Sequence, residues 1–308
     1  MRNVFSDTAL ESEFQQQGFV VVPFLAKDEV KQLKQAFFDG LPQSGGHLGP
    51  EDENVKTKQA ITYDFTFIDK NSDYKQQVFD TITAAFDTHT NRYLDRYIPI
   101  IANFIRKKTD DGEVPLHQNW AFLDEKLGTS VSIWCPLVDS NEENGTLQVV
   151  PGSHKRFGAV RGPMIRSELE DIKHGIIEQH LQPINIKAGE AVILDDSIVH
   201  YSAINKTDDL RLAIQLILLP QEIPSIHYHM DHSKSREHVE VLEVDRAFYM
   251  TFNPWKKPAA DIKRIHDFAY TPFSLTLEEF NQGLQNDRFD SKPAIAGIWG
   301  KFKSLLGA

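Results

Sequence analysis

The sequence predicts a mostly β fold with flanking helices, of the double-stranded β-helix or jelly-roll type found in cupin-like proteins. Short β-branched segments alternate with turn residues between about residues 98 and 220, a pattern typical of sandwiches and barrels. Helical patterns dominate residues 1–97, and histidine and charge are frequent early in residues 221–308. No internal repeat interrupts the chain. We therefore expect a single domain over residues 1–308: an N-terminal decoration of helices and strands, a jelly-roll core, and a C-terminal part with an excursion and helices.

The N-terminal decoration predicts a helix, a strand and a second helix. Residues 8–17 are helix formers that end at Gly18, a residue suited to a left-handed C-terminal cap. Residues 19–22 form a short β-branched run stopped by Pro23. Apolar residues then recur at helical spacing, which predicts the second helix, at Val30, Leu33 and Phe37.

The remaining elements follow from the same rules. Residues 61–68 predict a strand, and apolar positions within residues 78–86 mark one face of a long helix. The jelly-roll core predicts strands at residues 100–105, 130–137, 146–150, 184–186, 191–194 and 212–219. Residues 221–258 predict an excursion from the barrel. Residues 298–306 predict a short amphipathic helix that docks on the domain's own surface.

Composition excludes several classes of partner. The 308 residues carry a net charge of -11 and no basic stretch that could bind phosphates, so nucleic acid is not expected as a partner. The single cysteine, Cys135, excludes an internal disulfide and fits a reducing compartment. The N-terminus lacks the apolar run of a signal peptide, and no segment has the roughly 18 apolar residues of a membrane span. We therefore expect a cytoplasmic protein without a membrane partner, while the oligomeric state stays open.

Two distant histidines are the main functional signal. His117 lies in Val-Pro-Leu-His-Gln-Asn-Trp, and His200 lies in Leu-Asp-Asp-Ser-Ile-Val-His-Tyr-Ser. On a strand, residues i and i+2 share a face, so His117 and Asn119 would present a nitrogen and an oxygen to one point. A jelly roll can bring His200 beside them. Two imidazoles and one oxygen ligand leave positions open for a co-substrate and dioxygen, as in a non-haem Fe(II) centre.

An arginine predicts the co-substrate. Arg211 lies eleven residues beyond His200, and strand alternation places it on the same face as Ala213 and Gln215. An arginine that points into a barrel needs an anion, and its planar guanidinium fits a carboxylate through two parallel hydrogen bonds. A dicarboxylate that binds iron at one end and Arg211 at the other accounts for the whole set.

Simpler interpretations apply to other residues. Most of the twelve histidines are expected to be ordinary surface or core residues, among them His47, His89, His174 and His266. Four further residues have side chains of the types that bind zinc, and a structural zinc site is a less favoured interpretation of them: His227, His229, Asp231 and His232. Some basic residues could meet an anionic substrate, but solvated surface charge is the favoured interpretation of Arg106, Lys107, Lys108 and Arg161.

Together these motifs resemble the phytanoyl-CoA dioxygenase family of Fe(II)/2-oxoglutarate-dependent oxygenases. The likeness covers roughly residues 14–220. It rests on four stretches: Gly18–Leu25, His117–Trp120, the Asn144-Gly145 pair with Pro151-Gly152-Ser153-His154-Lys155, and Gly189 through His200 and Ser202 to Arg211. His117-Gln118-Asn119 matches the family's His-Gln-Asp motif except at its last ligand.

The resemblance implies roles for individual residues. His117 and His200 would bind Fe(II), Arg211 and Ser202 would hold the distal carboxylate of 2-oxoglutarate, and Trp134 would lie beside this co-substrate. Dioxygen would complete the reaction, which would hydroxylate a small organic metabolite. The substrate itself is not predicted.

Asn119 departs from the family pattern, because its amide lacks the charge of the usual carboxylate ligand. Family members that halogenate have alanine or glycine at this position. A natural variant with altered chemistry, a catalytically silent relative and a deliberate substitution are all open. Asp124 and Glu125 are not expected to substitute, since position 124 would face away from His117. Replacing Asn119 by Asp is expected to tighten Fe(II) binding by restoring a charge in a partly dry pocket.

Overall fold

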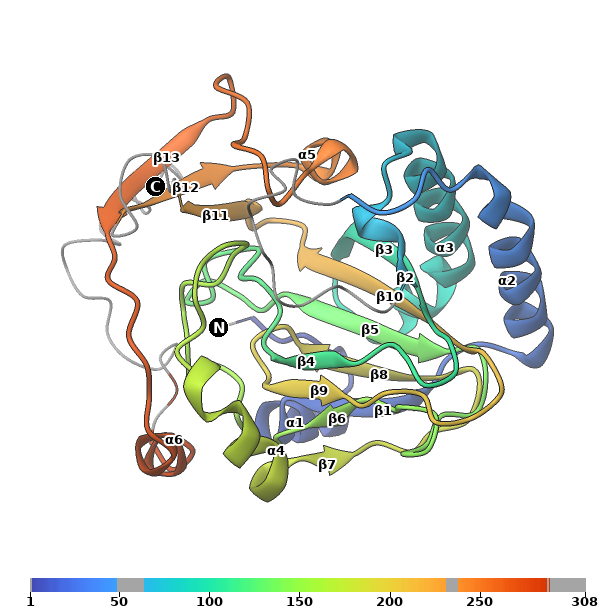
Figure 1. The fold of residues 1–308 in the computed structure, drawn as a ribbon, viewed down its shortest axis with the longest axis horizontal. Helices are drawn as coiled ribbons and strands as arrows, with labels where there is room; N and C mark the ends of the chain where they lie inside the picture. Colours follow the sequence, from blue (N-terminus) through green and yellow to red (C-terminus); the bar gives the residue numbers. More distant parts are fainter. Residues whose placement is uncertain (1, 49–63, 231–237, 287, 289–308) are drawn as a thin grey trace.

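Two antiparallel β-sheets form the centre of the computed structural model, which describes residues 2–48, 64–230, 238–286 and 288. The larger sheet has six strands in the spatial order β1-β8-β5-β10-β3-β2 (Figure 1). Their bounds are β1 (Phe19–Pro23), β2 (Asp64–Phe65), β3 (Tyr97–Lys107), β5 (Val131–Pro136), β8 (Glu190–Asp195) and β10 (Arg211–Pro220). The smaller sheet has the order β4-β9-β6-β7, formed by β4 (Val114–His117), β6 (Gln148–Val149), β7 (Gln182–Pro183) and β9 (His200–Ser202).

The space between the sheets is filled by one apolar cluster. Both sheets contribute to it, and its members include Phe19, Trp134, Val149, Val192, Leu194 and Ala213. Because strand side chains alternate, Arg211, Ala213 and Gln215 of β10 share a face. Ala213 belongs to this inner cluster, so the face that carries Arg211 points between the sheets. The predicted jelly-roll fold is confirmed.

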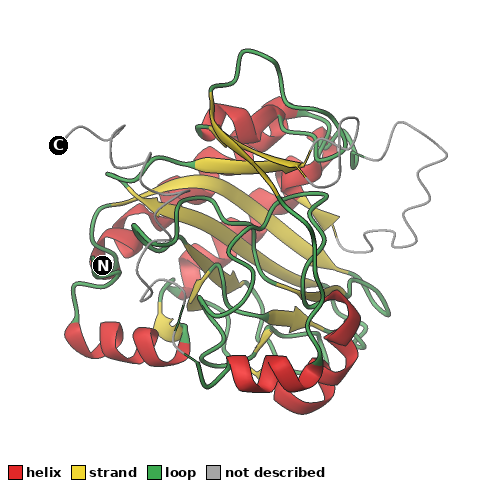
Figure 2. Ribbon diagram, turned by 90° about the vertical axis from the view of Figure 1, so that its left-hand side faces the viewer, coloured by secondary structure: helices red, strands yellow, loops and turns green. Residues whose placement is uncertain are grey.

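The opposite face of the larger sheet packs against helices. Figure 1 shows α2 (Lys27–Gly40) and α3 (Ser72–Tyr93) beside each other at one edge of the molecule. Figure 2, turned by 90°, shows the helices outside the sheets. Ile214 and Leu216 of β10 join apolar residues of both helices in the largest core cluster. Strands β1 and β2 precede residue 98, so the larger sheet draws on the N-terminal part of the chain as well as on the core.

The predicted N-terminal elements are confirmed. The first helix, α1, spans Thr8–Gln17, and Asp7 caps its start by accepting hydrogen bonds from two backbone N–H groups. Gly18 ends it in the left-handed conformation, with φ of 83°. A side chain at this position would collide with the His154 ring, whose nearest atom would lie 2.4 Å from an added Cβ. Glycine is therefore required here by both backbone and space.

The structure differs from the predictions in three segments. Within residues 61–68, of which the structure describes 64–68, strand β2 gives way to the short 3₁₀ helix η2 (Thr66–Ile68). Residues 184–186 form no strand and contribute one isolated bridge between Ser140 and Ile186. Residues 221–258 contain strands β11 (Ile226–Met230) and β12 (His238–Glu243), which pair with β13 (Arg264–Ala269) in a third antiparallel sheet.

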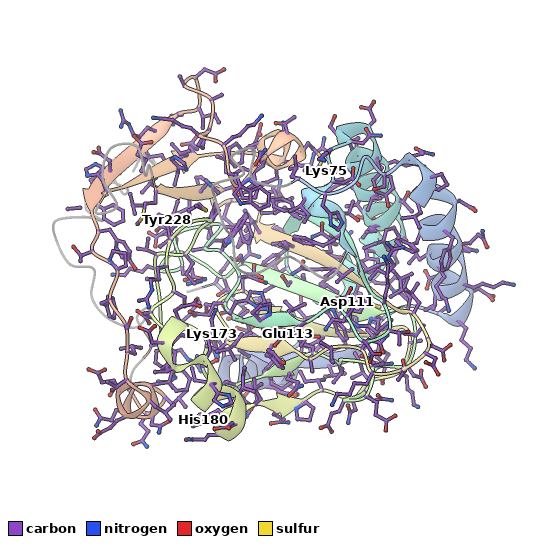
Figure 3. The ribbon with its side chains drawn as sticks, in the orientation of Figure 1. Lys75, Asp111, Glu113, Lys173, His180 and Tyr228 are labelled. Carbon is purple, nitrogen blue, oxygen red and sulfur yellow. The ribbon has the colours of Figure 1, made fainter. Side chains whose placement is uncertain are left out.

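Short helices complete the described residues. They are η1 (Leu41–Gln43), η3 (Glu170–Ile172), α4 (Lys173–His180), α5 (Arg246–Thr251) and α6 (Leu277–Gly283). The buried Lys75 of α3, labelled in Figure 3, donates to the Tyr249 carbonyl at 3.0 Å and so ties α3 to α5. The helix predicted at residues 298–306 lies outside the described residues. Among the helices described, none is long and apolar enough to cross a membrane.

Candidate active site

The two predicted histidines lie side by side at the ends of paired strands. His117 ends β4, His200 begins β9, and the two are partners in the antiparallel register. Their ring centroids are 4.1 Å apart. His117 Nδ1 contacts the Pro115 carbonyl at 2.8 Å, and His200 Nδ1 contacts the Ile198 carbonyl at 2.9 Å. A carbonyl can only accept, so each Nδ1 carries the proton and each Nε2 keeps its lone pair.

Both rings are held in the neutral form. Burial lowers the pKa of His117 to about 4. Burial, together with the neighbouring His117 ring, lowers the pKa of His200 well below its ordinary value. Neutral imidazoles with the second nitrogen fixed by a carbonyl are the form in which histidine binds metals.

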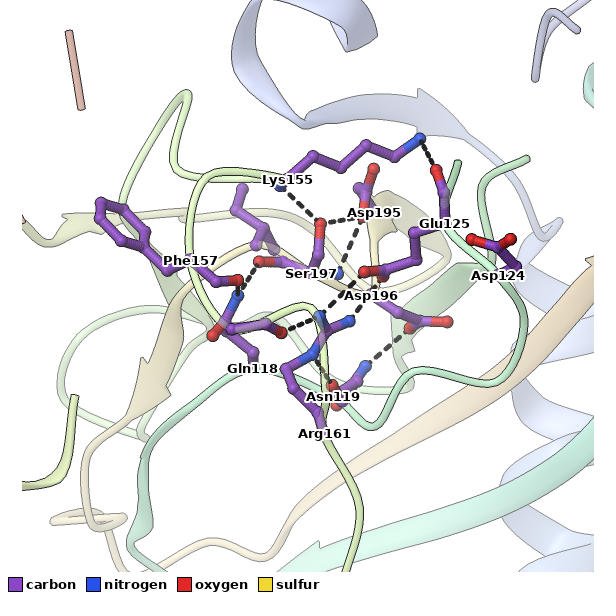
Figure 4. A network of polar contacts seen from close by, with 12 residues as sticks. Gln118, Asn119, Asp124, Glu125, Lys155, Phe157, Arg161, Asp195, Asp196 and Ser197 are labelled. Atoms are coloured by element: carbon purple, nitrogen blue, oxygen red, sulfur yellow. Dashed lines mark hydrogen bonds and ion pairs between the residues drawn. The ribbon is translucent and has the colours of Figure 1, made fainter. Parts of the chain in front are cut away.

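Asn119 is held at both its backbone and its side chain (Figure 4). Its carbonyl accepts a 2.7 Å hydrogen bond from Arg161 Nε. Its Nδ2 donates to Asp196 Oδ1 at 2.8 Å and to Ser132 Oγ at 3.1 Å. A polar interaction between the Asn119 side chain and His117 partly opposes the lowering of the His117 pKa. The amide therefore lies between the histidine pair and a buried carboxylate.

Asp196 is that carboxylate, and it is fully buried. Its Oδ1 also accepts a 2.6 Å hydrogen bond from the Ser132 hydroxyl, while Oδ2 has no hydrogen-bond partner in the described structure. Burial raises the pKa of Asp196 to about 7, against the opposing effect of polar interactions with Ser132, Asn119 and Ser130. This carboxylate is one hydrogen bond away from the position where the family motif places its own.

A buried ion pair supports the Asn119 backbone. Arg161 Nη1 and Nη2 donate to the two Glu125 oxygens at 2.9 and 2.6 Å. The expectation that Arg161 is a surface charge is wrong, because the side chain is buried and donates to Glu125 and to the Asn119 and Gly158 carbonyls. Glu125 is fully engaged by Arg161, which agrees with the view that it does not replace the ligand at 119. The neighbouring Asp195 accepts from the Ser197 amide and hydroxyl instead of from Asn119.

Arg211 lies deep between the sheets and is 2% exposed. Its Nη2 donates to the Gly145 carbonyl at 3.1 Å and to Ser202 Oγ at 3.3 Å. Its guanidinium carbon is 5.6 Å from the centre of the Trp134 ring. Nε and Nη1 are buried without hydrogen-bond partners, and no ion pair to Arg211 exists among the described residues. Burial alone lowers the pKa of Arg211 to about 9.

A second buried basic residue lies beside it. Lys107, at the end of β3, is 0% exposed, so the expectation of a surface charge is wrong for this residue. Its Nζ donates to the hydroxyl and carbonyl of Ser202 and to the Ala203 carbonyl. Burial, with a smaller effect of Arg211, lowers the pKa of Lys107 to about 5. Ser202 therefore accepts hydrogen bonds from the Lys107 amine and the Arg211 guanidinium at once.

An apolar cavity of about 340 Å³ opens beside the histidine pair. Its polar lining residues are Asn103, His117, Gln118, Asn119 and Gln215. Its apolar lining residues are Phe65, Phe67, Ile68, Ile101, Trp120, Phe122, Pro163, Met164, Ile217, Pro254 and Trp255. Asn103 Nδ2 donates to Gln215 Oε1 at 3.3 Å, and Asn103 Oδ1 has no partner in the described structure. No charged side chain of the described residues lines this cavity.

The rival histidine cluster has a different setting from the one expected. His227 lies on strand β11, is buried, and packs against the aromatic rings of Trp120, Phe248 and Phe252. Asp231 and His232 lie outside the described residues. Within the part of the chain that the structure describes, no three His, Cys, Asp or Glu side chains gather as a metal-ligand group.

A family model described as Phytanoyl-CoA dioxygenase (PhyH) matches residues 14–213. The chain belongs to the phytanoyl-CoA dioxygenase family. "Phytanoyl-CoA dioxygenase domain-containing protein 1 homolog" of Dictyostelium discoideum is 26% identical over 194 residues, which cover 60% of this chain and 66% of the relative. "Phytanoyl-CoA dioxygenase domain-containing protein 1" of Danio rerio is 35% identical over 107 residues, which cover 32% and 37%. The matched part is thus less than two thirds of either relative.

The solved structures agree on the fold of this phytanoyl-CoA dioxygenase family member. The non-heme alpha ketoglutarate dependent carbocyclase SnoK from nogalamycin biosynthesis superimposes with a TM-score of 0.52. The two are 17% identical, and the match covers 71% of this chain and 86% of SnoK. At this identity the likeness concerns the jelly-roll fold.

Sequence reasoning missed two residues of the site in this family member. Lys107 lies between Arg106 and Lys108 in the sequence, and three consecutive basic residues suggest a strand end that is exposed to solvent. Asp196 was visible in the Asp195-Asp196 pair four and five residues before His200. A carboxylate close in sequence to one predicted ligand, together with the missing carboxylate at position 119, could have suggested that Asp196 and Asn119 lie together.

Proposed function

We propose that this protein is an Fe(II)- and 2-oxoglutarate-dependent oxygenase that hydroxylates a small organic molecule and consumes dioxygen. The observation that carries the proposal is the buried Arg211, whose guanidinium has two unpartnered nitrogens and no counterion among the described residues. Ser202 accepts from Arg211 and lies two residues after His200 on β9. These contacts support a dicarboxylate site next to the pair of neutral imidazoles, and the family assignment supports the same chemistry.

His117, His200 and Asn119 would hold the iron. The two Nε2 lone pairs and the amide oxygen form a donor set of nitrogen and oxygen, which suits Fe(II) and leaves positions for a co-substrate and dioxygen. The carbonyls of Pro115 and Ile198 fix the two rings by accepting from Nδ1. Bound iron and 2-oxoglutarate would together supply the oxidising power of the reaction.

Arg211, Lys107 and Ser202 would hold the distal carboxylate of 2-oxoglutarate. Nε and Nη1 of Arg211 have no hydrogen-bond partner, so their N–H groups are available to donate to a carboxylate. Lys107 lies beside it and would add a second positive charge when it is protonated on binding. Buried charges are costly without a counterion, so a dianionic co-substrate would stabilise both basic groups in their charged form.

The cavity beside His117 favours a small and uncharged substrate. Its volume of about 340 Å³ is at the lower end of the range for small-molecule sites. Aromatic residues such as Phe67, Trp120 and Trp255 dominate its walls, and the described lining has no ion that could neutralise a charged substrate. Asn103 Oδ1 offers one open acceptor, which suits a substrate hydroxyl or N–H group.

The halogenating alternative needs a vacant ligand position for chloride. Asn119 occupies that position, and Asp196 and Ser132 hold its side chain in place. Hydroxylation is therefore favoured over carbon–halogen bond formation. A catalytically silent barrel that binds a metabolite is the remaining alternative, and it makes a different prediction for turnover.

The proposal is tested by calorimetry and by turnover. Anaerobic titration with Mn(II), and then with 2-oxoglutarate, should show one metal ion and one co-substrate per chain. His117→Ala and His200→Ala should abolish metal binding, whereas His174→Ala, which removes a side chain that is 88% exposed, should not. With Fe(II) and dioxygen the protein should release succinate. Binding without any succinate would favour the silent barrel, and absence of metal binding would reject the proposal.

A further inference from the structure

We propose that Asp196 is a positioning residue for the metal site: its carboxylate orients the Asn119 amide and replaces, from one hydrogen bond away, the charge that position 119 lacks. This inference rests on the proposed iron site at His117 and His200. It goes further because it assigns a role to a residue outside the ligand set. It also explains how a chain with asparagine at position 119 could keep a working site.

The hydrogen-bond directions determine how the amide lies. Ser132 Oγ is 2.6 Å from Asp196 Oδ1, and a carboxylate can only accept, so the hydroxyl proton of Ser132 points to Asp196. Ser132 then offers only lone pairs to its other neighbours. Asn119 faces both acceptors, at 2.8 Å and 3.1 Å, and must therefore present its NH₂ group to them. Its oxygen is left for the side of His117.

Asp196 has the properties expected of a carboxylate whose charge is balanced by a bound cation. It is 0% exposed, and the described residues include no ion pair to it. Its Oδ2 is buried without a hydrogen-bond partner. An isolated buried carboxylate is unfavourable, and a divalent cation beside Asn119 would offset this cost. The adjacent Asp195 is also buried with an unpartnered Oδ2, but its Oδ1 accepts from the Ser197 amide and hydroxyl, whereas that of Asp196 accepts from Asn119.

This arrangement changes the expectation for Asn119→Asp. An aspartate at 119 would place two carboxylates where the amide nitrogen and Asp196 are now 2.8 Å apart. Two carboxylates at that distance cannot both be ionised without a large penalty. The gain in metal affinity expected from the sequence would therefore be largely cancelled, unless Asp196 were changed as well. Exchanging the two residues, Asn119→Asp with Asp196→Asn, would restore one carboxylate and one amide in hydrogen-bond contact.

A double-mutant cycle tests the pairing. Mn(II) affinity is measured by calorimetry for the wild type, Asp196→Asn, Asn119→Asp and the exchanged double variant. Asp196→Asn should weaken Mn(II) binding about tenfold or more in the wild-type background, which is the usual effect of losing a residue that orients a ligand. The same substitution should tighten binding about tenfold in the Asn119→Asp background. This reversal of sign is specific to the pairing, because a general loss of charge or of folding would weaken both.

Two further measurements separate the possible outcomes. Asp195→Asn removes the same charge one residue away, and its effect on Mn(II) affinity should have the same sign in both backgrounds. Co(II) absorption spectra should differ between the wild type and Asp196→Asn if the orientation of Asn119 changes, while thermal midpoints report folding. If Asp196→Asn shifts the affinity in the same direction in both backgrounds, the pairing is wrong. If the wild type binds no metal at all, the failure lies with the proposed iron site instead.

Discussion

The two ends of the candidate site differ in the sign of the buried charge that has no counterion within the described chain. At the Asn119 end the buried cation is matched within the chain, since Arg161 pairs with both oxygens of Glu125, and the charge left over is the Asp196 carboxylate, which accepts only from the neutral Ser132 and Asn119. At the Arg211 end the basic groups have no counterion among the described residues, since Arg211 and Lys107 share Ser202 and backbone carbonyls as acceptors. Net negative charge remains at the first end and net positive charge at the second.

The difference indicates what each end receives from outside. Burying a charge without a counterion is costly, so a protein keeps such groups where a ligand supplies the counterion. The end with Asp196 suits a cation, and the end with Arg211 suits an anion. A metal ion and a dicarboxylate satisfy both requirements at once, and the predictions below test the two ends separately.

The largest expected effect is on the internally matched end. Glu125→Gln removes one partner of a bidentate buried pair and leaves Arg161 charged and uncompensated. We expect a loss of about 3–5 kcal/mol in the free energy of unfolding, measured by urea denaturation. Asp171→Asn, which removes the exposed partner of Arg166, should leave the denaturation midpoint nearly unchanged. Similar midpoints for the two variants would contradict the matched-charge description.

At the other end, the effect should appear in ligand binding. Arg211→Met removes the guanidinium that would pair with 2-oxoglutarate, and should weaken co-substrate binding by about 2–5 kcal/mol, or at least about thirtyfold. Arg211→Lys should bind with intermediate affinity, because a point charge cannot reproduce two parallel hydrogen bonds. Calorimetry with 2-oxoglutarate measures both. Unchanged affinity in Arg211→Lys would reject the bidentate role, and Mn(II) affinity is the control that should stay constant.

Lys107→Met should separate stability from binding. Lys107 loses its proton on folding at neutral pH, a cost that methionine avoids, so the variant should raise the free energy of unfolding of the ligand-free protein by about 1 kcal/mol, after the loss of the bonds to Ser202 and Ala203 is included. The same variant should bind 2-oxoglutarate more weakly. This combination contrasts with Glu125→Gln, which should only destabilise. If Lys107→Met were less stable and bound 2-oxoglutarate normally, Lys107 would be a structural residue.

The smallest effect is a proton taken up on binding. The pKa of Lys107 is lowered from 10.5 to about 5 in the ligand-free fold by burial, with a smaller contribution from Arg211. Between these values the unfolded chain binds a proton that the folded chain does not, so the stability contributed here increases as the pH rises from about 5. An anion beside Lys107 would raise its pKa again.

Binding of 2-oxoglutarate at neutral pH should therefore take up about one proton per site. Titrations in two buffers of different ionisation enthalpy measure this uptake, and Lys107→Met should abolish it. Equal heats in both buffers for the wild type would show that Lys107 is already charged in the free protein.

Local rules account for the parts that the sequence predicted well. The first helix ends at Gly18 because a left-handed cap needs no side chain, and this depends on neighbouring residues alone. Alternation along β10 places Arg211, Ala213 and Gln215 on one face for the same reason. The short strands from residue 98 onward indicated the jelly roll. Residues 184–186 failed as a strand because β pairing depends on a partner elsewhere in the chain.

By itself, the sequence determined the helix boundaries near the N-terminus, the fold class, and the two motifs that carry His117 and His200. Each is readable from residues within a few positions of one another. Only the tertiary structure decided that Lys107 is buried beside Arg211, and that Asp196 meets Asn119 across 77 residues of sequence. The physical reason is that burial and hydrogen bonding between distant residues depend on which strands pair. A single sequence carries no periodic signal for that pairing.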